Sequence, residues 1–110
     1  MADLVSRMTV AEKASQLRAV WGYALMENRE TFSEKKAADL LNSSIGQITR
    51  HGNATTLPPR EVAEFANLVQ QFLLEKTRLG IPALIHDECL CGYQARGATI
   101  FPQAIGLAST

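Results

Sequence analysis

Three ionisable side chains stand together in the second half of the chain, at His86, Asp87 and Glu88, directly before Cys89 and Cys91. Imidazole, carboxylate and thiolate groups all bind zinc, so one interpretation is a small metal site. The spacing fits no recognised zinc pattern. If the segment is extended, adjacent side chains point to opposite sides, so at most His86, Glu88 and one ligand from a distant part of the chain could meet.

A short apolar run precedes this cluster and must position it. Residues 81–85 read Ile-Pro-Ala-Leu-Ile after Gly80, which is typical of a strand that is buried on both faces. We therefore predict a parallel strand over residues 81–86. In α/β barrels the carboxyl ends of the strands carry the chemistry, so the polar cluster would lie where a site is expected.

Composition limits the classes of function. The chain has 110 residues, of which 46% are hydrophobic and 20% charged, as in ordinary globular proteins. Lys plus Arg equals Asp plus Glu, 11 each, so the broad positive field that holds nucleic acid is missing. No apolar stretch reaches the roughly 18 residues of a membrane span, and no secretory signal opens the sequence. We expect a soluble, cytoplasmic protein with no nucleic-acid or membrane partner.

The two cysteines, Cys89 and Cys91, are predicted to be free thiols. They lie two positions apart, which would strain a disulfide between them, and two thiols are too few for a four-cysteine zinc site. Nothing in the pattern calls for a metal ion or another cofactor.

Two helices are predicted in the leading part, residues 1–44. Thr9 and Glu12 have the spacing of a capping box, and apolar residues then recur at helical intervals, which predicts a helix over residues 9–26. The apolar positions of this helix are Val10, Ala14, Leu17, Trp21 and Leu25, whereas Glu12, Lys13, Gln16 and Arg18 are expected to face water. A polar loop over residues 27–31 precedes a second helix, residues 33–42, with Ser33 as its cap.

Residues 45–92 are predicted to form a βαβ unit. A short β-branched segment, residues 45–49, is followed by an amphipathic helix that begins after Pro58, covers residues 59–79 and ends near Gly80. The strand over residues 81–86 would then be parallel to the strand over 45–49. Arg50 and His51 follow the first strand and either point into a site or are merely solvated.

Residues 93–110 are predicted to form a loop and the start of another apolar helix beyond Pro102. Two parallel strands alone would have bare edges, so we expect an incomplete domain. Bare edges and apolar helix faces could also pair with another chain. A self-associating interaction module is therefore an alternative to an enzyme.

Three segments carry a family resemblance. Residues 4–13 read Leu-Val-Ser-Arg-Met-Thr-Val-Ala-Glu-Lys, residues 80–84 read Gly-Ile-Pro-Ala-Leu, and residues 97–103 read Gly-Ala-Thr-Ile-Phe-Pro-Gln. In this order they closely resemble glycoside hydrolase family 3, the β-glucosidase and β-xylosidase type. The resemblance implies an α/β fold, the opening βαβ portion of a (β/α)8 barrel of about 250 residues, with β-glucosides or β-xylosides as substrates.

The resemblance also implies one substrate-binding residue. The family has an acid, two intervening residues, usually a histidine, and then glycine after its second strand, and that acid binds sugar hydroxyls. The matching positions are Glu88, Cys91 in place of the histidine, and Gly92. Asp87 falls one place early and is expected to matter less. The alternative for Glu88 is a structural ion pair with a basic neighbour, Arg96 or Arg50.

No catalytic residue is expected within residues 1–110. Retaining glycosidases need a nucleophile and an acid/base about 5 Å apart, and the resemblance places both later in the family's chain. Asp87 and Glu88 cannot replace them, because adjacent strand residues project to opposite faces. The 110-residue chain is therefore expected to be an inactive fragment of a glycosidase.

Overall fold

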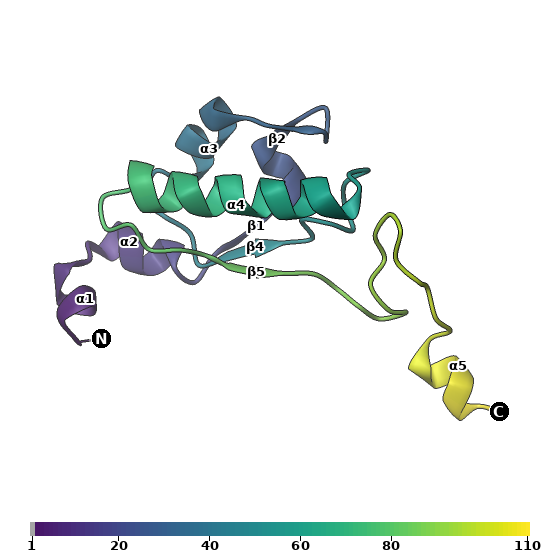
Figure 1. The fold of residues 1–110 in the computed structure, drawn as a ribbon. Coiled ribbons are helices and arrows are strands. Elements are labelled where there is room, and N and C mark those ends of the chain that lie inside the picture. The colour runs from purple at the N-terminus through teal and green to yellow at the C-terminus, as the bar shows by residue number, and fades with distance from the viewer. Residues whose placement is uncertain (1) are drawn as a thin grey trace.

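A computed structural model describes residues 2–110 (Figure 1). Its centre is a three-stranded parallel sheet in the order β1-β4-β5, formed by Ala19–Trp21, Gln47–Thr49 and Leu84–His86. Helices α3 (Glu34–Leu41) and α4 (Pro59–Lys76) lie on one side of this sheet. The predicted parallel pairing of the last two strands is confirmed, with Ile48 opposite Ile85.

The predicted helix over residues 9–26 is wrong. Helix α1 spans Ala2–Arg7 and α2 spans Val10–Ser15, after which the chain forms β1 and a 3-10 turn, η1, at Gly22–Leu25. Pairing with β4 satisfies the β1 backbone groups on one edge, which favours an extended conformation over a continuous helix there. The first parallel crossover is therefore β1-α3-β4, and its strand β1 lies inside residues 1–44, which we expected to hold helices alone.

Burial over residues 10–17 departs from the predicted pattern, although Lys13 is exposed as predicted. Val10 is 83% and Leu17 is 88% exposed, whereas Glu12 is buried. The capping box is confirmed, because the Glu12 amide donates to Thr9 Oγ1 and the Thr9 amide donates to Glu12 Oε2. Arg78 then covers the carboxylate, with Nε 2.8 Å from Oε1 and Nη2 2.5 Å from Oε2. The hydrogen bond from Arg78, followed by that from the Thr9 backbone, lowers the Glu12 pKa to about 2.

Residues 27–31, predicted as a loop, are part of a short antiparallel hairpin. Strand β2 (Met26–Glu27) pairs with β3 (Thr31–Phe32), and the turn holds Asn28 and Arg29 at φ values of 50° and 62°. Asparagine tolerates this left-handed region better than most residues, so Asn28 suits the turn of a hairpin. The Ser33 cap of α3 is confirmed by its bond from the Lys36 amide.

Helix α4 supplies five of the thirteen buried core residues in the described chain, more than any other element. Its predicted apolar stripe is confirmed, although the helix ends at Lys76 and the chain passes through a turn in which Gly80 has a φ of 58°. The buried core comprises Leu25, Met26, Ala37, Leu41, Ile45, Ile48, Leu57, Val62, Phe65, Val69, Phe72, Leu73 and Ala83. These residues lie between the sheet and the two helices.

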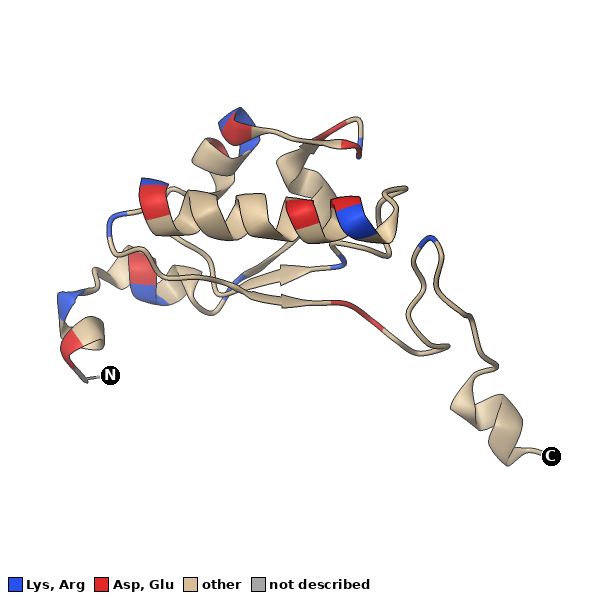
Figure 2. Ribbon diagram, in the orientation of Figure 1, with Lys and Arg blue, Asp and Glu red and all other residues tan. Residues whose placement is uncertain are grey.

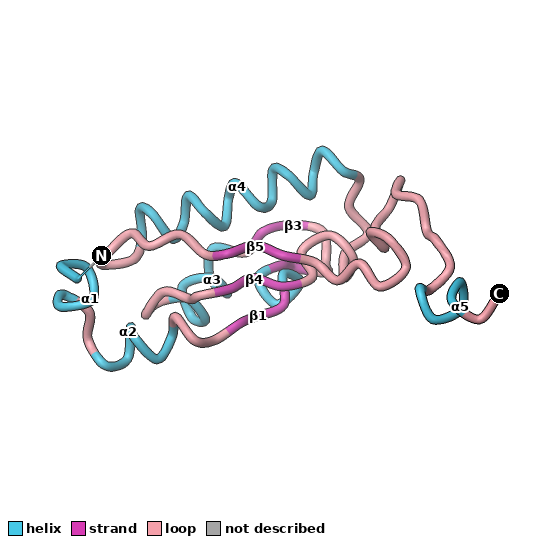
Figure 3. Tube along the Cα trace, turned by 90° about the horizontal axis from the view of Figure 1, so that it is seen from below, coloured by secondary structure: helices cyan, strands magenta, loops and turns pink. Residues whose placement is uncertain are grey.

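The opposite face of the sheet is uncovered in the described chain. Figure 3, seen from below, shows the three strands with no helix in front of them. On this face Leu84 is 64% exposed and Trp21 is 41% exposed. The prediction that the strand ending at residue 86 is buried on both faces is therefore wrong for this chain.

The last residues extend away from the sheet. Helix α5 (Ala104–Ala108) confirms the predicted apolar helix start, but every residue from 99 to 110 is exposed. The radius of gyration is 16.1 Å, against about 13 Å for a compact domain of this length. Among residues 2–110, no helix has the length and apolarity to cross a membrane.

Candidate functional site at the carboxyl ends of the strands

The three strands end side by side, and polar or aromatic residues follow each end. Trp21, Thr49 and His86 stand in register across β1, β4 and β5. Figure 2 shows the acidic segment after β5 next to the basic position after β4. The Arg50 amide donates to the His86 carbonyl at 2.9 Å, which joins the two strand ends beyond the regular sheet.

Glu88 is paired with Arg50. Arg50 Nη2 lies 2.5 Å from Glu88 Oε2, and the Glu88 side chain remains 61% exposed. The guanidinium also lies over the Trp21 ring, with its carbon 4.5 Å from the ring centroid. Of the two basic neighbours expected as partners, the structure therefore selects Arg50, while Arg96 lines a separate pocket with Glu30 and Glu61.

Asp87 has a different set of partners. Its side chain is only 5% exposed, and its oxygens accept hydrogen bonds from the Gly52 amide at 3.2 Å and the Asn53 amide at 3.3 Å. His51 Nδ1 lies 2.8 Å from Asp87 Oδ2 but lacks the geometry of a hydrogen bond. Asp87 thus fastens the loop after β4 to the segment after β5, a role that the sequence did not indicate.

Tyr93 closes the buried side of this loop. Burial, followed by the negative charge of Asp87, raises the Tyr93 pKa to about 12, so its hydroxyl stays protonated. A Cβ on Gly52 would lie 1.7 Å from the Tyr93 hydroxyl oxygen, which explains why glycine occupies this position. Sequence reasoning did not single out Tyr93, because nothing local to residue 93 shows its packing against residue 52.

His86 offers an unused polar atom. Its Nε2 is buried and has no hydrogen-bond partner among residues 2–110, and the same holds for Asn53 Oδ1. Cys89 is exposed and Cys91 half-buried, both as free thiols. In the described part of the chain, no three His, Cys, Asp or Glu side chains come close enough to hold a metal ion. The arrangement suits hydrogen bonding to a polar ligand.

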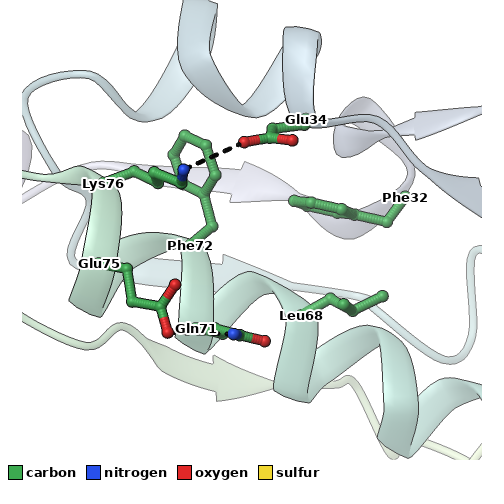
Figure 4. Close-up of a pocket in the computed structure, with 7 residues that line it drawn as sticks. All are labelled: Phe32, Glu34, Leu68, Gln71, Phe72, Glu75 and Lys76. Atoms are coloured by element: carbon green, nitrogen blue, oxygen red, sulfur yellow. Dashed lines mark hydrogen bonds and ion pairs between the residues drawn. The ribbon is translucent and has the colours of Figure 1, made fainter.

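The strand ends are separate from a pocket on the helical side. That pocket has a volume of about 260 Å³ and lies between β3, α3 and α4 (Figure 4). Lys76 and Glu34 approach to 3.7 Å at its rim. None of its lining residues follows a strand of the parallel sheet: Phe32, Glu34, Leu68, Gln71, Phe72, Glu75 and Lys76.

Comparison with known proteins identifies the family. Residues 9–110 match the model of the glycosyl hydrolase family 3 N-terminal domain. The chain belongs to glycosyl hydrolase family 3. This family 3 chain is 30% identical over 110 residues to a putative beta-xylosidase of Formosa agariphila, and 30% identical over 118 residues to beta-glucosidase C of Emericella nidulans.

A further relative, a probable beta-glucosidase C of Aspergillus flavus, is 32% identical over 120 residues. Each comparison covers 97% of the family 3 chain. The chain spans only 14% of the Formosa relative and 18% of each fungal relative. The resemblance found in the three sequence segments is thereby confirmed at the level of the family.

Proposed function

We propose that this chain is the opening part of the N-terminal (β/α)8 barrel of a retaining β-glycosidase that hydrolyses β-glucosides or β-xylosides. The relatives are named as a beta-xylosidase and beta-glucosidases, and the matched family domain is the N-terminal one. A parallel sheet with helices on one face and an uncovered second face suits the wall of a barrel. Residues 1–44, 45–92 and 93–110 would be successive portions of that single domain.

Within this proposal Glu88 binds the sugar. The assignment depends on one observation: Glu88, two residues beyond the end of β5, presents an exposed carboxylate at the carboxyl end of the sheet. Arg50 Nη2 contacts Oε2, and the Glu88 side chain is still 61% exposed. A carboxylate oxygen held in this way can accept hydroxyl protons, and such charge-assisted bonds are about twice as strong as neutral ones.

The 110-residue chain is proposed to bind sugar without cleaving it. Glycoside hydrolysis with retention of the anomeric configuration needs two carboxyl groups about 5 Å apart, one on each side of the scissile bond. Asp87 is occupied by the amides of Gly52 and Asn53, and Glu88 is paired with Arg50, so the two acids do not face one sugar together. Nucleophile and acid/base would come from later parts of a complete enzyme.

A second candidate is association with another chain. Leu84 and Trp21 are exposed on the uncovered sheet face, and within residues 2–110 the outer edges of β1 and β5 have no strand partner. Such surfaces favour self-association. A size that rises with protein concentration, together with binding of an apolar-surface dye, would favour this candidate over a sugar-binding domain.

Nitrophenol release from aryl β-glucoside and aryl β-xyloside tests the proposal. We expect no turnover by the 110-residue chain. Turnover is expected from a protein in which residues 1–110 continue into the rest of a family 3 enzyme. Activity of the 110-residue chain that survives rigorous purification and disappears in Glu88→Ala would contradict the proposal that this chain binds sugar without cleaving it. A correctly folded long protein without activity on either substrate would contradict the substrate class.

A further inference from the structure

Arg50 occupies a special position in the backbone. It follows β4 directly and has a φ of 54°, in the left-handed region that residues with a side chain rarely adopt. Its amide donates to the His86 carbonyl, so the conformation is fixed by the neighbouring strand end. Uncommon backbone conformations of this kind persist where surrounding contacts enforce them and are concentrated at functional sites.

The Arg50 side chain connects the other two strand ends. Its guanidinium carbon lies 4.5 Å from the centroid of the Trp21 ring, which belongs to β1. Its Nη2 atom lies 2.5 Å from Glu88 Oε2, beyond β5. The Arg50 side chain is 31% exposed, half the value for Glu88. A planar guanidinium can stack on an aromatic ring and engage a carboxylate at its edge at the same time.

Glu88 has little else to hold it. It lies in an irregular segment after β5, its side chain is 61% exposed, and Arg50 is its ion-pair partner in the described chain. A flexible carboxylate would lose side-chain entropy on binding a ligand, whereas a carboxylate whose orientation is already fixed would lose less. Arg50, which is stacked on Trp21 and paired with Glu88, can fix the orientation of the Glu88 carboxylate.

We propose that Arg50 is a positioning residue that, stacked on Trp21, holds the Glu88 carboxylate in the direction needed to accept sugar hydroxyls. The inference rests on the proposed function, since it takes Glu88 as the sugar-binding acid. Lysine would be a poor substitute, because an ammonium group keeps the charge but lacks the planar fork and the stacking face.

Trp21 is the single tryptophan of the chain, so its fluorescence reports on this site alone. The first measurement compares Trp21 emission in the 110-residue chain with that of Arg50→Gln, Glu88→Gln and the control Arg60→Gln. Arg60 forms a matched arginine–glutamate pair with Glu64 on α4 and is far more exposed. We expect Arg50→Gln to shift the emission, Glu88→Gln to shift it in the same direction, and Arg60→Gln to leave it unchanged.

The emission data alone can overturn the inference. An unchanged spectrum in Arg50→Gln would show that the guanidinium does not rest on the indole in solution. A shift in Arg50→Gln with none in Glu88→Gln would show that the carboxylate and the stack are independent. Circular dichroism of each variant establishes that the fold is retained before spectra are compared.

The second measurement titrates the same proteins, and also Arg50→Lys, with methyl β-glucopyranoside and methyl β-xylopyranoside, following Trp21 emission and the amide resonance of residue 88. We expect Kd to rise about tenfold or more in Arg50→Gln and Glu88→Gln, and to recover only partly in Arg50→Lys. Arg60→Gln should bind as the unchanged chain does.

The outcomes separate the inference from the function on which it rests. Loss of binding in Glu88→Gln with near-normal binding in both Arg50 variants would remove the positioning role and leave Glu88 as the sugar-binding acid. Unaltered binding in Glu88→Gln would remove the proposed function of Glu88 itself. If the unchanged chain binds neither glycoside up to the solubility limit, the site is not preassembled in this chain and the inference is overturned.

Discussion

Replacing Asp87 with alanine should destabilise this chain far more than replacing its neighbour Glu88. The Asp87 carboxylate is 5% exposed and accepts hydrogen bonds from two loop amides, those of Gly52 and Asn53. Alanine removes both acceptors and leaves two amides without their partner at the base of the loop. The substitution therefore tests whether Asp87 fastens the β4 and β5 ends together.

The expected size follows from the geometry. A hydrogen bond to a charged acceptor contributes about 1.5 to 3 kcal/mol, but these bonds are long for charge-assisted ones. With the amides at 3.2 and 3.3 Å from the carboxylate, each bond should lie at the lower end. We expect Asp87→Ala to lower the free energy of unfolding by about 2 to 3 kcal/mol. Glu88→Ala removes an exposed ion pair and should cost less than about 1 kcal/mol.

Urea denaturation of both variants and hydrogen exchange at Gly52 and Asn53 provide the measurement. Asp87→Ala should lower the midpoint clearly and expose both amides, whereas Glu88→Ala should leave these amides protected. Asp87→Asn serves as an intermediate, because its amide oxygen can accept one of the two bonds. Equal midpoints for Asp87→Ala and Glu88→Ala, with unchanged protection in both, would refute the assignment.

Three further perturbations address the rest of the fold. The hydrogen bond from Arg78 lowers the Glu12 pKa from 4.5 to about 2, so the ionised Glu12 stabilises the fold above about pH 4.5 and this stabilisation is lost as the pH falls toward 2. In acid unfolding, Glu12→Gln should lack this pH-dependent part of the stability. Identical pH profiles for Glu12→Gln and the unchanged chain would contradict the role of Glu12. Ile48→Ala empties a fully buried position and should cost about 2 to 5 kcal/mol in urea unfolding, while a cost under about 1 kcal/mol would mean that the core is loose. Gly52→Ala places a Cβ 1.7 Å from the Tyr93 hydroxyl oxygen and should lower the melting temperature. Adding Tyr93→Phe to Gly52→Ala removes that oxygen and should recover part of the lost melting temperature. An unchanged melting temperature in Gly52→Ala would contradict the close packing of Tyr93 against Gly52.

Local patterns predicted those elements that local interactions determine. The capping box at Thr9, the Ser33 cap and the apolar stripe of α4 depend on neighbours within one or two turns, and all were found as expected. Strand β1 was missed because its three residues are specified by pairing with β4, whereas the helical spacing of the surrounding apolar residues favoured a helix. Leu17, one of those apolar residues, is exposed.

The candidate site was predictable in position but not in its internal contacts. The end of the apolar run located His86, Asp87 and Glu88 at the strand terminus, and Arg50 was named as a possible ion-pair partner. The burial of Asp87 depends on amides 34 and 35 positions earlier in the chain, a separation that no local pattern reveals. Trp21 was missed together with the strand that carries it.

The proposed role of Glu88 as a substrate-binding acid can be measured by kcat/KM in a family 3 enzyme that carries residues 1–110. Glu88→Gln and Asp87→Asn should be assayed side by side on aryl β-glucoside and β-xyloside, with melting temperatures recorded for both. Glu88→Gln removes charge-assisted hydrogen bonds worth about 1.5 to 3 kcal/mol, so it should lower kcat/KM about tenfold to a few hundredfold at an unchanged melting temperature. Asp87→Asn should lose activity only in proportion to its loss of stability. Full activity in Glu88→Gln, or a loss that merely follows its melting temperature, would contradict the account.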